Sequence, residues 1–472
     1  MTTMSSTSSR YGEIVRLSAP IAGIQFAQVA LTTVDLLMMG LLGVDSVAAG
    51  GLGLLLYNQL RTMSVGMVTG VGNLVAGAVG RAEKRSGSAA IDAAGRDEIR
   101  DLVRAAMLIA TVTGLVAGLL LVVLGHALPY LGQDPDVVAL ARPIMLALAP
   151  GLLPMLWMNV LRQFAVGLRR PGSLLVVTLV SIGLNALLDA VFIYGWLGLP
   201  KLGLAGIGLS TTLVQLWTFA VYLRMVRRDA AMNDVLALDA WRARRETVMR
   251  ILRMGTPISL TYGSEAAITS IASLFMGTFG PVALAASNVV NQLAYIVYQA
   301  NIGLSQGTSI LVSRALGRGE RAEIGQIARQ ALTISLSLMS AIGFVYIVSP
   351  EAVLLPFLGE RGDGAVLGVA SSLLWFAVAH QIFKGSQNIC VGLLRGLGNT
   401  KAGLTNTLIG YWLIGIPAMA LCAHATGWGP YGVWFGLCLG FGATSLLLWR
   451  RFTLELARLP AAHGDGESVP AA

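Results

Sequence analysis

One segment of this chain occurs twice. Residues 16–81 align with residues 253–318 at a constant offset of 237 and without a gap. The positions that recur are, in the first copy, Arg16, Pro20, Ile21, Thr32, Met39, Gly40, Gly43, Ala48, Ala49, Gly66, Gly70, Gly80 and Arg81. Both copies lie within long apolar runs, so the repeated unit is predicted to be a membrane unit. Twinned halves around a central site are typical of secondary transporters.

The chain contains enough apolar sequence to cross a bilayer many times. It is 55% hydrophobic and only 12% charged, whereas soluble domains are about 25% charged. A spanning helix needs about 20 apolar residues, and none of the runs has the alternation of a barrel strand. We therefore predict an all-α membrane protein with twelve transmembrane helices, at about 16–42, 47–79, 105–126, 137–160, 172–199, 204–226, 251–277, 282–314, 328–349, 365–393, 402–424 and 430–449.

Six spans per half is an even number, so both halves enter the membrane with the same orientation. The expected architecture is two parallel six-helix repeats in a two-lobe transporter. The predicted units are an N-lobe (1–226), a cytoplasmic linker (227–250), a C-lobe (251–458) and a disordered tail (459–472).

Basic residues lie mostly on one side of the predicted spans. All but five of the 33 Lys and Arg fall in the N-terminus, the even-to-odd loops or the C-terminus; the exceptions are Arg61, Arg142, Lys201, Arg361 and Lys384. By the positive-inside rule, both termini are cytoplasmic in a multi-pass protein of the cytoplasmic (inner) membrane. The net charge of +9 thus orients the chain, and we expect no nucleic-acid partner.

A few ionisable side chains lie inside the predicted spans, where each costs about 2.5–3.5 kcal/mol on insertion scales. They are Asp35, Arg61, Asp189, Glu265 and Lys384. Each alone could be a polar residue that holds helices together, but three carboxylates spread over both halves favour an ion pathway. No spacing of His, Cys and acids resembles a metal site, and no hydrolytic triad is present. We therefore expect no enzyme activity and no cofactor.

Several motifs resemble the multidrug and toxic compound extrusion (MATE) family, over roughly residues 11–455. They are the run Thr33-Val-Asp-Leu-Leu-Met-Met-Gly-Leu-Leu-Gly, Gly392-Leu-Leu-Arg-Gly-Leu-Gly-Asn-Thr-Lys, Gly410-Tyr-Trp-Leu-Ile-Gly-Ile-Pro and Gly432-Val-Trp-Phe-Gly. The resemblance is to the bacterial NorM-like branch. It implies a V-shaped pair of six-helix lobes and export of organic, cationic or aromatic compounds, including antibiotics, in exchange for protons or sodium.

The resemblance also implies particular site residues. Asp35, Asn185 and Asp189 match an N-lobe cation site, where sodium could bind Asp35 and Asp189, and Thr211 is a weaker match. Pro20 matches a proline at which the first helix bends in some members.

In the C-lobe, Glu265 matches an acid of the sodium-coupled branch, but Lys384 stands where that branch has an aspartate. We predict that Lys384 pairs with Glu265, or else lines the cavity unpaired. Coupling then moves to the N-lobe acids, with H+ favoured over Na+. The other partners expected are a small organic substrate and membrane lipid, and we expect a monomer.

Two other classes of function stay open. Arg61 and Lys384 within the membrane would suit a flippase or exporter of an anionic or lipid-linked substrate on a related two-lobe fold. A non-transporting membrane scaffold would leave the buried carboxylates unexplained.

Overall fold

The computed structural model describes residues 2–131, 135–358 and 364–460, and these residues form helices and their connections without a strand. The first half comprises α1 (Thr2–Leu41), α2 (Val44–Thr69), α3 (Val71–Ser86), α4 (Ala93–Ala127), α5 (Pro135–Leu148), α6 (Leu152–Gly167), α7 (Gly172–Tyr194), α8 (Leu204–Arg228) and the short α9 (Ala230–Asn233). The predicted tail lies almost wholly outside the described residues.

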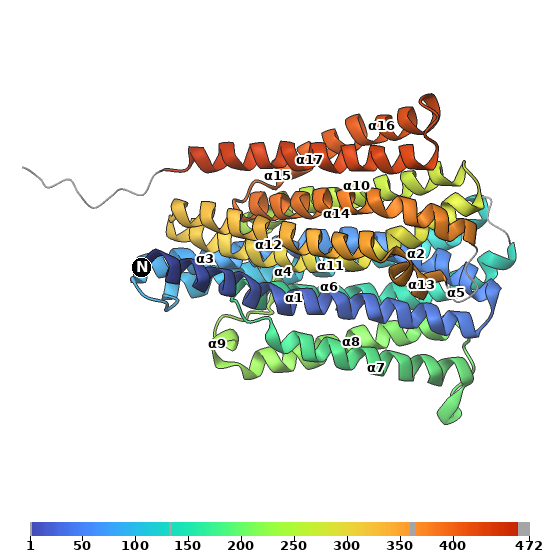
Figure 1. Ribbon diagram of the computed structural model, residues 1–472. Helices are drawn as coiled ribbons and strands as arrows, with labels where there is room; N and C mark the ends of the chain where they lie inside the picture. Colours follow the sequence, from blue (N-terminus) through green and yellow to red (C-terminus); the bar gives the residue numbers. More distant parts are fainter. Residues whose placement is uncertain (1, 132–134, 359–363, 461–472) are drawn as a thin grey trace, which may run out of the picture.

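The second half follows the same plan. It comprises α10 (Arg245–Gly277), α11 (Pro281–Arg318), α12 (Arg321–Val348), the short α13 (Pro350–Leu358), α14 (Gly364–Gly396), α15 (Thr400–Leu408), α16 (Ile416–Ala420) and α17 (Pro430–Arg458). Helix α2 continues into α3, a 3-10 turn joins α5 to α6, and π-helical turns flank α16. The long helices run side by side as one bundle, with both ends of the described chain near one end of it (Figure 1).

Twelve helical segments are long enough to span a bilayer, as the sequence predicts. In the described part of the chain, ten of them are also apolar enough by composition. Helices α10 and α11 are the other two, because polar residues interrupt their apolar runs. In α11, Gln299, Asn301 and Gln306 are at most 8% exposed, so they face protein rather than lipid. The exposed apolar side chains of α4, such as Leu119, instead form an outer surface suited to lipid.

The repeated glycines lie where the two halves cross. Gly66 of α2 faces Ser259 of α10, and Gly303 of α11 faces Ala22 of α1; a Cβ on either glycine would lie 2.5 Å from a backbone atom of its neighbour. The offset of 237 converts one contact into the other. The two halves are therefore related by an approximate two-fold axis that passes between these crossings.

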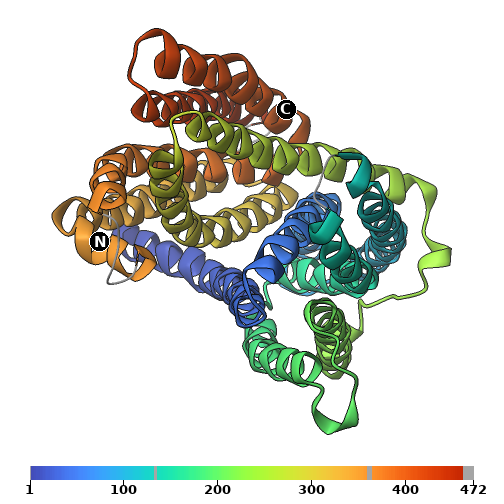
Figure 2. The same ribbon diagram turned by 90° about the vertical axis from the view of Figure 1, so that its right-hand side faces the viewer.

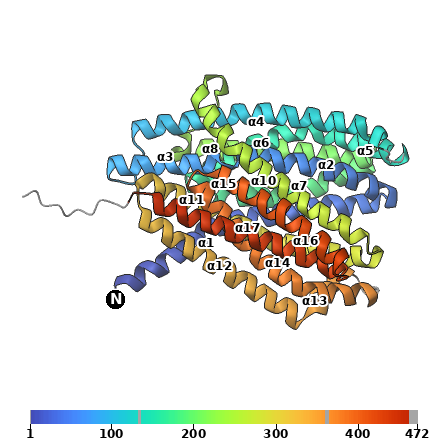
Figure 3. The same cartoon turned by 90° about the horizontal axis from the view of Figure 1, so that it is seen from above.

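A second pair of crossings obeys the same relation. Gly80 of α3 packs against the backbone of Arg314 in α11, and Gly317 of α11 packs against the backbone of Gly77 in α3. Seen end-on, α1 lies against helices of the second half (Figure 2). Seen from above, α10 crosses the bundle obliquely (Figure 3) and packs on α2. Small residues permit such close approach between membrane helices.

We expect Gly303→Ala to destabilise the protein by about 1–3 kcal/mol, because the added methyl overlaps the backbone at Ala22. The matched control is Gly183→Ala in α7, where a Cβ meets nothing within 4 Å. Thermal unfolding of the purified variants measures the difference. Equal melting temperatures for the two variants would show that the crossing tolerates the extra volume.

Candidate ion-exchange site and adjoining cavity

Two buried carboxylates share one amide in the first half. Asn185 of α7 donates to Asp35 of α1 over 2.6 Å and to Asp189, one turn further along α7, over 3.0 Å. The side chains of Asp189 and Asn185 are fully buried, and Asp35 is 3% exposed. The structure thus brings together the three residues that the sequence assigned to this site.

Helix α8 completes the site with two consecutive hydroxyls. Thr211 donates to Asp35 over 3.4 Å, and Ser210 donates to Asp189. Each hydroxyl also lies near the carbonyl of Ile207, so it can turn toward backbone when the carboxylate is protonated or bound to a cation. Sequence reasoning found Thr211 but missed Ser210, although the run Ser210-Thr211-Thr212 was a signal that this face of α8 is polar.

The charges at this site do not balance. Within the described residues, no Lys, Arg or His nitrogen lies within 4.0 Å of Asp35 or Asp189. Two negative charges placed close together in a water-poor interior repel one another, and a bound proton or cation relieves that repulsion. The arrangement can therefore take up and release a small cation.

Asp35 also lines a cavity. The cavity lies among α1, α2, α6, α7 and α8, and its wall includes Gln28, Tyr57, Arg61 and Met158 as well as Asp35. Asp189 lies behind Asp35 and is not part of this wall. One acid of the pair thus faces the cavity, and the other does not.

The second half holds an ion pair in place of an acid pair. The Nζ of Lys384 in α14 lies 3.2 Å from Oε1 of Glu265 in α10, and each side chain is 15% exposed. The ammonium also sits over the ring of Tyr298, 4.2 Å from its centroid, and 5.4 Å from that of Phe441. The predicted pairing of Lys384 with Glu265 is confirmed, and aromatic faces add to the stabilisation of the ammonium.

Pro20 lies inside α1, which is one helix from Thr2 to Leu41. The proline removes a backbone donor at this point. The expectation that α1 bends at Pro20 concerns another conformation of the protein, and it stays a prediction.

Two arginines that the sequence placed in loops are buried within helices. The predicted fourth span ended at residue 160, but α6 continues to Gly167 and contains Arg162. The predicted tenth span ended at residue 393, but α14 continues to Gly396 and contains Arg395. Both side chains are only 3% exposed. The apolar runs end before these positions, so hydropathy gave no signal that the helices and the packed interior continue.

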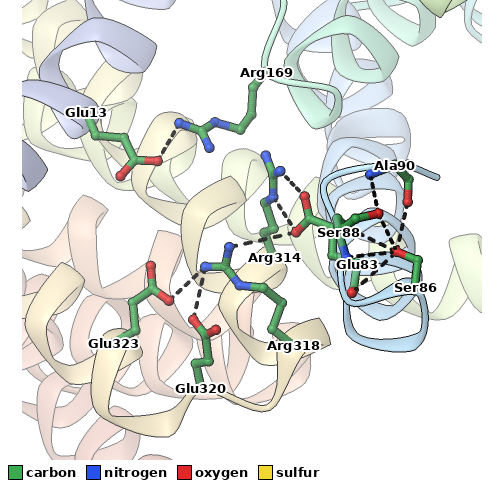
Figure 4. Close-up of polar contacts among 10 residues, drawn as sticks. All are labelled: Glu13, Glu83, Ser86, Ser88, Ala90, Arg169, Arg314, Arg318, Glu320 and Glu323. Carbon is green, nitrogen blue, oxygen red and sulfur yellow. Dashed lines mark hydrogen bonds and ion pairs between the residues drawn. The ribbon is translucent and has the colours of Figure 1, made fainter.

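Ion pairs join the halves at the end of the bundle where α1 begins and α3 ends, which we call the basic end. Glu83 of α3 binds Arg314 of α11, and Arg318 lies 3.7 Å from the same carboxylate (Figure 4). Arg318 also contacts Glu323 and Glu320 of the second half at 2.7 and 3.1 Å. Because the side chain of Glu83 is only 9% exposed, these residues form a partly buried ion-pair network that links the two halves.

Comparisons with known proteins agree with this arrangement of helices. The MatE family model matches residues 20–191 and 257–421, once in each half. A protein of Pseudomonas aeruginosa named "Probable multidrug resistance protein NorM" is 35% identical over 94% of this chain and 90% of its own length. A protein of the same name from Rhizobium meliloti is 33% identical over 94% of each chain.

Among solved structures, an outward-facing multidrug resistance MATE family transporter of the MOP superfamily superimposes with a TM-score of 0.83. It is 19% identical, with 95% of this chain and 96% of the other covered. The fold is thus that of the MATE transporters. The chain belongs to the MatE family, as its motifs predicted.

We expect the Lys384–Glu265 pair to be energetically coupled. Lys384→Ala or Glu265→Ala alone leaves a buried charge without its partner, which costs about 3–5 kcal/mol when the pair is fully buried and less at 15% exposure. The double variant should recover a large part of the loss. Thermal unfolding of both single variants and the double variant measures the coupling, and additive losses would contradict it.

Proposed function

We propose that this protein exports organic cations, including aromatic drugs, in exchange for protons, with Asp35 and Asp189 as the exchange site. The observation that carries the proposal is a pair of buried acids that Asn185 joins and whose outer member lines a cavity. Among the residues that the structure describes, no basic side chain lies within 4.0 Å of either acid. Sodium is the alternative coupling ion, because carboxylate and amide oxygens also bind hard cations.

Competition for negative charge is the proposed basis of exchange. An organic cation in the cavity is attracted by the carboxylate of Asp35. When a proton reaches the acid pair, that charge falls and the attraction weakens, so the drug is released on the side from which the proton came. The protein must then be open to one side of the membrane at a time, which rocking of two lobes provides.

The second half favours protons over sodium in this proposal. Glu265 already holds the ammonium of Lys384 at 3.2 Å, so its carboxylate has a cation that cannot leave. Exchange would then take place at the first-half acids alone. We further propose that the basic end faces the cytoplasm, since it collects most of the Lys and Arg, and that the membrane is the bacterial inner membrane.

An anionic or lipid-linked substrate is the weaker reading. It relied on Arg61 and Lys384 as two free cations within the membrane, but Lys384 is paired with Glu265. Arg61 still lines the cavity, and its role is taken up below.

We expect ethidium to trigger proton release from proteoliposomes that hold a pH gradient, in the absence of sodium. Asp189→Asn should reduce this release to background, because Asp35 without a negatively charged neighbour then binds a proton less readily. The matched control is Asp45→Asn, an exposed acid of α2 outside the site, which should behave as wild type. Release that requires sodium and ignores Asp189 would contradict the proposal.

We expect transport to require separation of α3 and α11, which the ion pairs of Glu83 hold together at the basic end. Asn73 of α3 donates to the Oγ of Ser309 in α11 over 2.6 Å, so cysteines at both positions should form a disulfide between the halves. With Cys390, Cys422 and Cys438 replaced by alanine, oxidation of Asn73→Cys/Ser309→Cys should stop ethidium efflux, and a reductant should restore it. Each single cysteine variant is the control. Undiminished efflux after complete cross-linking would show that the halves need not part here.

A further inference from the structure

Among the described arginines well inside the spanning helices, three are not exposed and have no acidic partner: Arg61 of α2, Arg162 of α6 and Arg395 of α14. In the described ranges, none of them lies within 4.0 Å of a carboxylate oxygen. Arg395 has long contacts of 3.4 Å with the hydroxyls of Tyr262 and Ser305. Arg61 and Arg162 have no hydrogen bond of this kind to a described side chain.

Arg61 lines the cavity described above, and Arg162 lies close to Arg61 without being part of the cavity wall. Arg61 lies one turn beyond Tyr57, which is also in the wall. Arg162 lies one turn beyond Met158, a third residue of the wall, and its guanidinium interacts electrostatically with that of Arg61. Two like charges thus lie beneath one face of the cavity.

The donors of these two side chains are not used by the protein. The Nε of Arg61, and the Nε and Nη1 of Arg162, are buried and have no hydrogen-bond acceptor among the described residues. A buried donor without an acceptor is costly, and more so when it is charged. Arginines that only tie helices together bind backbone carbonyls or acids, so a packing role does not account for both.

We propose that Arg61, supported by the charge of Arg162, forms an anion-binding subsite of the cavity that receives a carboxylate of the substrate. The planar guanidinium of Arg61 can bind a carboxylate through two parallel hydrogen bonds. This inference rests on the proposed function in one respect, that the cavity holds the substrate.

The same cavity then presents both signs of charge. Asp35 and Arg61 line it together, yet they form no ion pair with each other. Tyr57 lines the same cavity, one turn before Arg61 along α2. The arrangement fits an amphoteric substrate: an amine toward Asp35, a carboxylate toward Arg61, and an aromatic body packed between Tyr57 and the sulfur of Met158.

Rhodamine B and its methyl ester test the subsite, because they share a cationic ring system and differ only in a free carboxylate. Fluorescence anisotropy with the full chain in nanodiscs gives a Kd for each dye. The readout is the Kd of the ester divided by the Kd of the acid. A loss of affinity that affects both dyes equally cancels in this ratio. In the wild type the acid should bind more tightly, and Arg61→Gln should lower the ratio by about tenfold or more.

Further variants separate charge from geometry. Arg61→Lys keeps the charge but loses the planar fork, so it should lower the ratio less than Arg61→Gln. Arg162→Gln should lower it by a smaller factor than Arg61→Gln, since Arg162 acts through Arg61. With the unaltered protein, benzoate should displace rhodamine B and benzamide should not, which tests the subsite even if an arginine variant fails to fold.

The outcomes distinguish this inference from the proposed function. If the ester binds and Asp35→Asn weakens it, but the ratio is the same in wild type, Arg61→Gln and Arg61→Lys, the anion subsite is wrong and the cation site stands. Failure of benzoate to compete with rhodamine B also overturns the subsite. If neither dye binds the wild type, the substrate cavity and the subsite are both wrong.

Discussion

The two halves of this protein touch through backbone, and that contact determines where its charged side chains lie. At Gly66 and Gly303 there is no space for a Cβ between crossing helices. These crossings bring α1 against α11 and α10 against α2. Since α1 carries Asp35 and α10 carries Glu265, the same packing that joins the halves also fixes the helices that carry an acid from each half.

The fold is nearly symmetric, but its chemistry is not. The offset of 237 places Ala272 at the position of Asp35 and Gln28 at the position of Glu265. Each half thus has one acid within the apolar part of its first helix, at a different position along the helix and with different partners. Asp35 meets Asn185 and a second acid, whereas Glu265 meets a lysine. A repeat can therefore supply equal scaffolds while a few substitutions make only one half suitable for exchange.

The sequence was sufficient for the architecture and for most of the site. The repeat, the apolar runs and the motifs predicted the twelve helices. The i, i+4 spacing of Asn185 and Asp189 predicted that both side chains lie on the same face of one helix. Ser210 was missed, since serine is common in membrane helices and its partner is set by how α8 packs on α7. Arg162 was missed for a different reason: arginine ends an apolar run, and only tertiary packing shows that the helix and the interior continue past it.

The Glu265–Lys384 pair and the acid pair around Asn185 differ in whether the positive partner can dissociate from the carboxylate. A lysine is tethered to its helix, so the ammonium near Glu265 can neutralise that acid but cannot be carried across the membrane. In the part of the chain that the structure describes, the acids around Asn185 have no such internal cation, so a proton or cation from outside the protein must balance their charge. Under the proposed exchange, Lys384 neutralises Glu265 permanently, so the second half binds no exchanging ion. Coupling then depends on Asp35 and Asp189, whose charge is balanced by a proton or cation from solution. The unpaired Arg61 in the same cavity would let that outside partner carry an acid as well as an amine.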